Sequence, residues 1–357
     1  MRIGQSELYA VMKERLFRVS SAISRRFGNV LWWSAFALLA VMALWCFGAF
    51  FHAFDVPESA AWAAAVVLTA FLAASPFYRQ ALWGAVALEL FTIAAYQTIR
   101  PEQRFSGTVW QKPWKRTLGV RKIAGGGYEL RNVRDFFYRT ENDYVVRYRS
   151  VTVFPEEISS IDIVFSHWDN MEEIAHSMLG LNFADGTTVV ISLETRLPEG
   201  RKQNGIDGFY RRYGLAMIAG TPEDLYGLRA DHRGETLYVY RVNLDHGSLC
   251  GMTISFLEQA AALERNPVFY NSLFRNCTTG LLPMLQRTDQ EVSCSLRVML
   301  NGLAAKMLYD EELLSSRKNE SFGSLRARSL VPGLCCGKDA PHMRYNGASE
   351  CRWLRNR

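Results

Sequence analysis

The stretch that decides the fold spans residues 175–194 and reads AHSMLGLNFADGTTVVISLE. Two runs of alternating residues, 175–183 and 187–194, flank Ala184-Asp185-Gly186. A three-residue connection that ends in glycine is typical of a β-hairpin closed by a type I turn and a left-handed residue. Such a turn pairs Phe183 with Thr187 and, further along the ribbon, His176 with Glu194.

The two faces of this predicted hairpin differ in chemistry. The face expected to pack in the core is apolar and carries Leu179, Leu181, Phe183, Val189, Ile191 and Leu193. The face expected to floor a cleft is polar or small and carries His176, Met178, Gly180, Asn182, Thr188, Val190, Ser192 and Glu194. Opposed side chains on one face lie about 5 Å apart at Cβ, so His176 and Glu194 are expected to meet. A carboxylate beside an imidazole suits a general base, although a plain cross-strand polar contact is the commoner explanation of such a pair.

Outside this hairpin, the sequence predicts an α+β domain with an antiparallel sheet over residues 128–310. Runs rich in Val, Ile, Phe and Tyr predict strands at 128–132, 135–139, 143–150, 161–165 and 236–243. Apolar residues at helical intervals predict helices at 252–265 and 294–309. A basic linker at 99–127, with three consecutive glycines, is expected before this domain. A polar, cysteine-containing tail at 311–357 is expected after it.

The first part of the chain is apolar enough for a membrane anchor. Residues 29–51 carry no charged side chain over a length that crosses a bilayer. Apolar runs follow at 59–77 and at 81–98, where Glu89 is the single charge, so three transmembrane helices are predicted over 29–98. The first run is too long for a signal peptide, and no small-residue cleavage site follows promptly. The anchor is therefore expected to be retained.

Basic residues set the predicted orientation of this anchor. They are frequent in residues 1–28, whereas the link at 52–58 carries only acidic charges. Positive charge stays inside, so the N-terminus is expected in the cytoplasm, where 1–28 forms an amphipathic helix on the membrane surface. Three crossings of the cytoplasmic membrane then place the chain after residue 99 outside the cytoplasm.

The composition excludes several classes of function. With 49% hydrophobic and 21% charged residues, the chain is neither disordered nor wholly embedded in a membrane. Much of the net charge of +6 lies at 11–26 and 100–122, where it can face lipid phosphates or solvent, so the bilayer and not nucleic acid is the expected partner. The sequence has no glycine-rich phosphate loop and no close HxxxH or CxxC spacing, so neither a metal nor another cofactor is expected.

Residues 270–285, YNSLFRNCTTGLLPML, supply a candidate nucleophile. Cys277 lies where an apolar helical pattern begins, beside Asn276 and Thr278, whose side chains suit helix N-capping. A helix N-terminus and a nearby imidazolium favour the thiolate form of cysteine. A buried thiol or half of a disulfide is the alternative, and Pro283 would kink or shorten the helix. Outside the anchor, disulfides are open to Cys250, Cys294, Cys335, Cys336 and Cys351, with no pairing deducible.

Several short motifs together resemble the Lnb N-terminal periplasmic domain family. The motifs, within residues 100–310, are Asn132-Val133-Arg134-Asp135-Phe136 with Tyr138, the hairpin through Ile191-Ser192-Leu193-Glu194-Thr195-Arg196, Arg229 with Arg233-Gly234, and Tyr270-Asn271 followed by Asn276-Cys277-Thr278-Thr279. The family is similar to permuted NlpC-like, papain-type thiol enzymes, in which the histidine precedes the cysteine. The resemblance implies Cys277 as nucleophile, His176 as base and Glu194 as third polar residue. Binding or supporting roles fall to Asn276, Thr278, Ser192, Arg196 and Tyr270.

The same resemblance implies acyl chemistry at a membrane. The family's named bacterial example is a lipoprotein N-acyltransferase, so the expected function is a membrane-anchored thiol acyltransferase or hydrolase acting on a lipid or lipoprotein ester or amide. A cell-wall amidase or endopeptidase and a non-catalytic membrane-tethered binding module are the alternatives. A sulfur well beyond about 5 Å from the imidazole would favour the binding module. Arg196 and Arg229 suit an anionic headgroup, although a structural ion pair is the favoured role of both.

Overall fold

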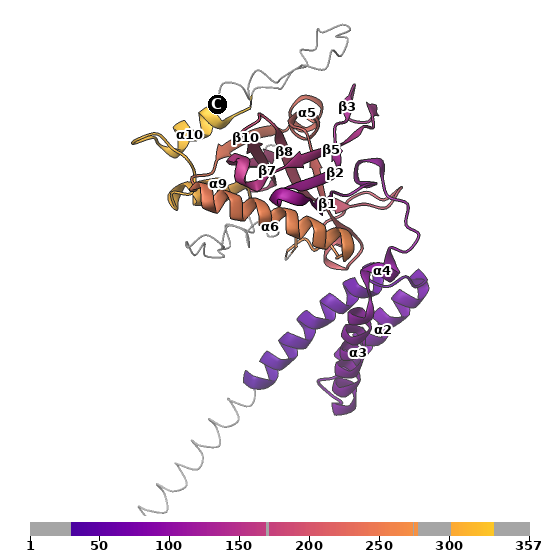
Figure 1. Ribbon diagram of the computed structural model, residues 1–357. Helices are drawn as coiled ribbons and strands as arrows, with labels where there is room; N and C mark the ends of the chain where they lie inside the picture. Colours follow the sequence, from indigo (N-terminus) through magenta and orange to yellow (C-terminus); the bar gives the residue numbers. More distant parts are fainter. Residues whose placement is uncertain (1–29, 169–170, 274, 278–300, 332–357) are drawn as a thin grey trace, which may run out of the picture. The chain divides into compact units, whose positions relative to one another are not determined.

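The computed structural model describes residues 30–168, 171–273, 275–277 and 301–331 (Figure 1). The chain divides into two compact units, Met1–Arg100 and Pro101–Arg357, which are described one at a time. The helix predicted at 1–28, Thr278, the helix predicted to begin at Cys277 and most of the one predicted at 294–309 lie outside the described residues.

Helices make up the described part of the first unit. They are Val30–His52, α2 (Glu58–Ala74) and α3 (Arg79–Thr98). Small and apolar side chains are buried among them, namely Ala43, Cys46, Phe50, Ala61, Ala65, Leu68 and Ala85. Within the described residues, Val30–His52 is the one helix both long and apolar enough to cross a membrane. The other two predicted spans are also helical, although α2 has 17 residues and α3 carries Arg79 and Glu89. Three membrane spans therefore stay a prediction.

A mixed sheet of eight strands forms the centre of the second unit (Figure 1). The strands are β1 (Gly119–Lys122), β2 (Tyr128–Arg134), β5 (Tyr148–Val153), β6 (Ile158–His167), β7 (Ala175–Phe183), β8 (Thr188–Arg196), β9 (Gly214–Gly220) and β10 (Thr236–Arg241). They lie in the order β1-β2-β9-β8-β7-β6-β10, with β5 also paired to β2. The sheet is not purely antiparallel as predicted, because β9 returns beside the earlier β2 in the same direction. A separate ribbon pairs β3 (Phe137–Tyr138) with β4 (Tyr144–Val145).

The hairpin of β7 and β8 has the predicted register. Met178 pairs with Ser192 and Asn182 pairs with Thr188. The Phe183 N–H donates to the Thr187 carbonyl at 2.9 Å, and Gly186 has a φ of 86°. Glycine adopts this left-handed conformation without the steric cost that other residues meet. The loop therefore fixes which residues of the two strands share a face.

The predicted apolar face of the hairpin lies in the main core, which α6 (His246–Arg265) covers (Figure 1). Asp245 begins α6 as its N-cap by accepting a hydrogen bond from the Ser248 N–H at 3.0 Å, so the helix starts earlier than the apolar pattern predicted. Helix α9 (Ala304–Asp310) adds Ala304, Ala305, Met307 and Leu308 to this core. Burying a large apolar side chain contributes about 1.5–3 kcal/mol, so this face stabilises the sheet that carries the site.

The opposite face of the hairpin is mostly covered, which corrects the prediction of a cleft floor. Met178 and Val190 are fully buried in a second cluster with Leu225 and Tyr226 of α5 (Pro222–Gly227). A Cβ atom at Gly180 would lie 2.8 Å from the Tyr226 hydroxyl, so glycine is needed for this helix to approach. The polar end of the face around His176 and Glu194 stays partly exposed.

The domain extends beyond both predicted boundaries. Residues 99–127, expected to form a linker, instead contribute β1 to the sheet, and Leu118 is 1% exposed with its N–H donating to the Met217 carbonyl at 2.9 Å. The described part of the predicted tail also packs on the domain. Helix α10 (Phe322–Ser329) buries Leu325, and Val331 N–H donates to the Leu237 carbonyl at 2.9 Å. Isolated apolar residues in polar segments gave too weak a pattern to predict these contacts.

Candidate active site

His176 and Glu194 meet on the polar end of the β7–β8 hairpin, as their opposed positions predicted. The imidazole Nε2 lies 3.1 Å from Glu194 Oε1 and 2.7 Å from Ser192 Oγ. The Ser192 hydroxyl donates to Glu194 Oε1 at 2.7 Å. Because this proton points at the carboxylate, the serine oxygen can accept from Nε2 only if that nitrogen carries hydrogen. The contacts thus favour a protonated Nε2 and direct the titrating role to Nδ1.

Arg229 completes the surroundings of Glu194 from a different element. It lies in a π-helical turn (Leu228–His232) after α5, and its Nη2 donates to Glu194 Oε1 at 2.9 Å. Its Nη1 donates to the Leu225 carbonyl at 3.0 Å, and the residue is 5% exposed. The guanidinium therefore forms the structural ion pair favoured from the sequence. Its position holds the carboxylate oxygen that faces His176.

These buried charges shift both partners of the pair. Burial raises the pKa of a carboxyl group, yet the charges of His176 and Arg229 hold the pKa of Glu194 well below 4.5. Burial lowers the pKa of an imidazole, but Glu194 outweighs this effect and, together with Cys277, raises the pKa of His176 to about 9. His176 therefore keeps its positive charge across the neutral range.

Cys277 reaches His176 from a loop that is distant in the chain. The loop runs along the sheet edge, where the Tyr270 N–H donates to the Tyr213 carbonyl at 3.0 Å. Asn276 Nδ2 then donates to the Ser272 carbonyl at 2.9 Å, which closes the turn before the cysteine. The Cys277 thiol is in no disulfide and is half-buried, and it shares a side-chain hydrogen bond with His176. The structure thus places the predicted nucleophile and base in contact.

Tyr270 and Arg196, which were also predicted to support the site, differ in their surroundings. Burial and, after it, the charge of Cys277 raise the pKa of Tyr270 to about 12, so this phenol is neutral at neutral pH. Arg196 lies away from the carboxylate. Its guanidinium donates to the carbonyls of Trp114 and Lys115 at 3.0 Å and covers the Trp110 ring at 4.3 Å. Main-chain oxygens and an aromatic ring therefore take the place of the ion pair favoured from the sequence.

A buried network next to the site was not predicted from the sequence. Arg134 Nη2 lies 2.6 Å from Asp224 Oδ1 and donates to the Tyr138 hydroxyl at 2.7 Å. Asp224 also accepts the Phe136 N–H at 2.8 Å. Arg134 and Tyr138 stood in the quoted motifs without an assigned role, whereas Asp224 had no signal of its own. The network fixes α5, and with it the helical turn that carries Arg229, to β2.

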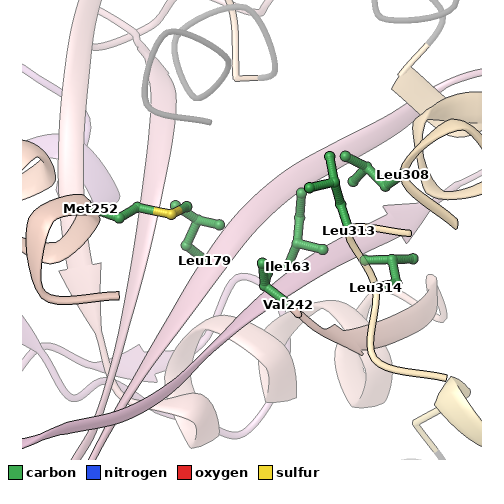
Figure 2. A pocket seen from close by; sticks show the side chains of 7 residues that line it. All are labelled: Ile163, Leu179, Val242, Met252, Leu308, Leu313 and Leu314. Atoms are coloured by element: carbon green, nitrogen blue, oxygen red, sulfur yellow. The ribbon is translucent and has the colours of Figure 1, made fainter. Parts of the chain in front are cut away.

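The apolar cavity in the main core is not part of this site. Figure 2 shows its lining, Ile163, Leu179, Val242, Met252, Leu308, Leu313 and Leu314. Leu179 points to the opposite side of β7 from Met178 and Ser192, so the cavity lies across the sheet from the polar pair. Its volume of about 10 Å³ is near the least that holds one water molecule, so the cavity is too small for an acyl chain.

Residues 144–304 match the family model of the Lnb N-terminal periplasmic domain. The match confirms the resemblance predicted from the motifs. It contains His176, Glu194, Arg229 and Cys277, whereas the motif at 132–138 lies before it. No curated protein and no solved structure matches the chain. The match to a periplasmic domain family and the apolar helix Val30–His52 together fit a membrane-associated protein with a periplasmic domain.

Proposed function

We propose that this protein is a thiol acyltransferase or hydrolase that acts on an acyl ester or amide of a lipid or lipoprotein. The observation that carries the proposal is the hydrogen bond between Cys277 and His176, with Glu194 behind the imidazole. A thiol, a base and a group that orients the base are the parts of an activated nucleophile. Permuted papain-like connectivity is part of the proposal, because the histidine precedes the cysteine.

The first half of the reaction transfers the acyl group to sulfur. Because His176 is charged at neutral pH, the thiol proton already lies on its Nδ1 when the reaction starts. Cys277 Sγ attacks the carbonyl carbon as a thiolate, and a tetrahedral oxyanion forms. The Cys277 N–H is the proposed donor to this oxyanion. When the intermediate collapses, the carbon–oxygen or carbon–nitrogen bond breaks and His176 returns the proton to the leaving alcohol or amine. The acyl group then remains on sulfur as a thioester.

The second half releases the acyl group to an acceptor. An amine, hydroxyl or water attacks the thioester carbonyl and gives its proton to His176, and the thiolate leaves. Throughout both halves Glu194 stabilises the positive charge on the imidazole, and Ser192 and Arg229 hold Glu194 in place. We propose that the acyl donor and acceptor lie at the periplasmic face of an inner membrane. The anchor is proposed to cross this membrane several times.

The contact between sulfur and imidazole argues against a purely non-catalytic binding module. A domain that only binds a partner gains nothing from a buried cation aimed at a thiol, since burial of charge is costly. The pKa of about 9 for His176 means that this cost is met by Glu194 within the site. The arrangement is what a reactive cysteine requires.

A lipid-like electrophile that alkylates thiols tests the proposal. Membranes containing the full chain are treated with the probe, and the modified cysteine is identified by peptide mass spectrometry. We expect labelling at Cys277 in the wild type, loss of that label in Cys277→Ala, and at least tenfold slower labelling in His176→Ala.

Cys250 provides a matched control within the same chain. It is also a half-buried thiol in no disulfide with an imidazole nearby, since its Sγ lies 3.5 Å from His246 Nε2. Burial and Glu156 raise its pKa, so it should stay a thiol and label slowly. Labelling of Cys250 as fast as Cys277, or an unchanged rate at Cys277 after removal of His176, would exclude the proposed mechanism.

A further inference from the structure

Three loops form a single rim beside Cys277. They are residues 101–111, residues 197–212 and the described residues of 268–277. The Gln111 N–H donates to the Leu197 carbonyl at 3.1 Å, which joins the first loop to the second. The Ser272 hydroxyl donates to the Gly205 carbonyl at 3.0 Å, which joins the second to the third. The rim is therefore one surface built from three parts of the chain.

Each loop of this rim presents an exposed apolar side chain. Val109 is 60% exposed, Ile206 is 52% exposed and Leu273 is 36% exposed. Behind them Phe105 packs on Trp110 with ring centroids 5.1 Å apart and on Phe269 at 5.5 Å. The apolar tips thus stand on a packed aromatic base. A surface that is already ordered loses little conformational entropy when it binds.

The same rim is basic. Its cations are Arg104, Arg201, Lys202, Arg211, Arg212 and Arg275, and its acids are Glu102, Glu199 and Asp207, so six positive charges oppose three negative ones. Arg201, Lys202 and Arg275 are exposed. The first loop continues directly from Arg100, the last residue of the unit that contains the membrane-length helix. The chain therefore enters the domain through this rim.

We infer that the rim binds the surface of an anionic lipid bilayer. Exposed apolar side chains between cations suit the boundary between lipid headgroups and acyl chains. There the apolar side chains insert into the bilayer and the cations contact lipid phosphates. In this arrangement Val109, Ile206 and Leu273 enter the headgroup layer, and Arg201, Lys202 and Arg275 contact lipid phosphates. Docking would bring acyl esters to Cys277, and this consequence rests on the proposed acyl transfer, whereas the binding itself does not.

Site-specific photo-crosslinking tests the docking in the full chain. The protein is placed in nanodiscs of phosphatidylcholine with increasing phosphatidylglycerol, and a photoreactive residue replaces Ile206 or, as a control, Phe137 of β3. The two sites are matched, since Phe137 is 51% exposed and Ile206 is 52% exposed. We expect lipid adducts at Ile206 several times more often than at Phe137, rising with phosphatidylglycerol. Equal yields at the two sites, or adducts of Ile206 with protein in place of lipid, would overturn the inference.

A pair of charge variants separates electrostatic attraction from simple proximity. Arg201→Gln with Lys202→Gln removes two rim cations, and Arg121→Gln with Lys122→Gln removes the same dipeptide charges from β1. Each cation at an anionic surface strengthens binding roughly fivefold. The rim variant should lose most of its lipid adducts and the β1 variant should keep them; an unaffected rim variant refutes the inference.

The same crosslinking in a Cys277→Ala background distinguishes docking from catalysis. Adducts at Ile206 should persist there, because the apolar tips and cations are unchanged. Docking without turnover in the wild type would refute the proposed acyl transfer and leave the rim assignment standing. Turnover without docking would refute the rim assignment and leave the proposed acyl transfer standing.

Discussion

Replacing Glu194 by glutamine tests the electrostatic coupling at the centre of the site. Against the effect of burial, the Glu194 carboxylate, together with Cys277, raises the pKa of His176 from 6.5 to about 9. That rise corresponds to about 3 kcal/mol in favour of the charged imidazole. In Glu194→Gln the imidazole is still buried and still faces Arg229, so its pKa should fall well below 9.

The sign of the effect on stability follows from the raised pKa. A histidine that binds its proton more tightly in the folded state stabilises that state fully below pH 6.5, and the contribution is lost as the pH rises through about 9. The depressed pKa of Glu194 adds a contribution that is present above pH 4.5 and is lost in acid below it. The difference in stability between the wild type and Glu194→Gln should therefore be largest between pH 4.5 and 6.5.

Thermal unfolding of the full chain in detergent, followed by tryptophan fluorescence, measures this difference. About 3 kcal/mol corresponds to roughly 6–12 °C in the midpoint of a domain of this size. The gap between wild type and Glu194→Gln should be largest near pH 6 and should shrink by about that amount at pH 10. Glu258→Gln, which removes an exposed partner of Lys122, should show no such trend. A gap for Glu194→Gln that is equal at pH 6 and pH 10 would refute the coupling.

Three further changes probe other parts of the same structure. Ser192→Ala removes the hydroxyl between His176 and Glu194 and should slow probe labelling of Cys277 about tenfold to hundredfold, with the pH dependence of the rate shifted; an unchanged profile would mean that the serine only fills space. Asp224→Ala leaves the buried Arg134 guanidinium unpaired and should cost about 3–5 kcal/mol in unfolding free energy, whereas Asp143→Ala, at an exposed pair with Arg139, should cost at most about 1 kcal/mol; equal losses would contradict the burial argument. Gly180→Ala places a Cβ 2.8 Å from the Tyr226 hydroxyl and should cost about 1–3 kcal/mol, which Tyr226→Phe should partly restore, while Gly251→Ala on the open side of α6 should be neutral or stabilising; the same loss at both glycines would remove the steric explanation.

The local parts of the fold followed from sequence patterns, and the long-range parts did not. The β7–β8 hairpin was predicted because its alternation and its glycine turn are both short-range signals. Strand β9 was missed because Gly214–Gly220 is flanked by glycines and has one β-branched residue. Glycine is needed at position 220, because a Cβ there would lie 2.9 Å from Leu225 Cγ. Such a requirement comes from a neighbour elsewhere in the chain and leaves no periodic trace.

The candidate site divides in the same way. The contact between His176 and Glu194 followed from register alone, whereas the contact with Cys277 came from the family resemblance. Arg229 was placed among the motifs, but its hydrogen bond to Glu194 depends on the turn after α5. Arg196 was assigned an ion pair from charge alone, and the structure gives it carbonyl and indole contacts instead. An arginine in a sequence does not show whether its guanidinium will contact a carboxylate, main-chain carbonyls or an aromatic ring.

The hairpin that joins imidazole to carboxylate has a consequence for the order in which the protein matures. Its two strands are adjacent in sequence, so this half of the site needs only a short loop to close and can form early in folding. The sulfur arrives from a later segment that must first settle along β9. A partly folded chain therefore carries the base without a positioned nucleophile, and the thiol stays unactivated until the domain is almost complete.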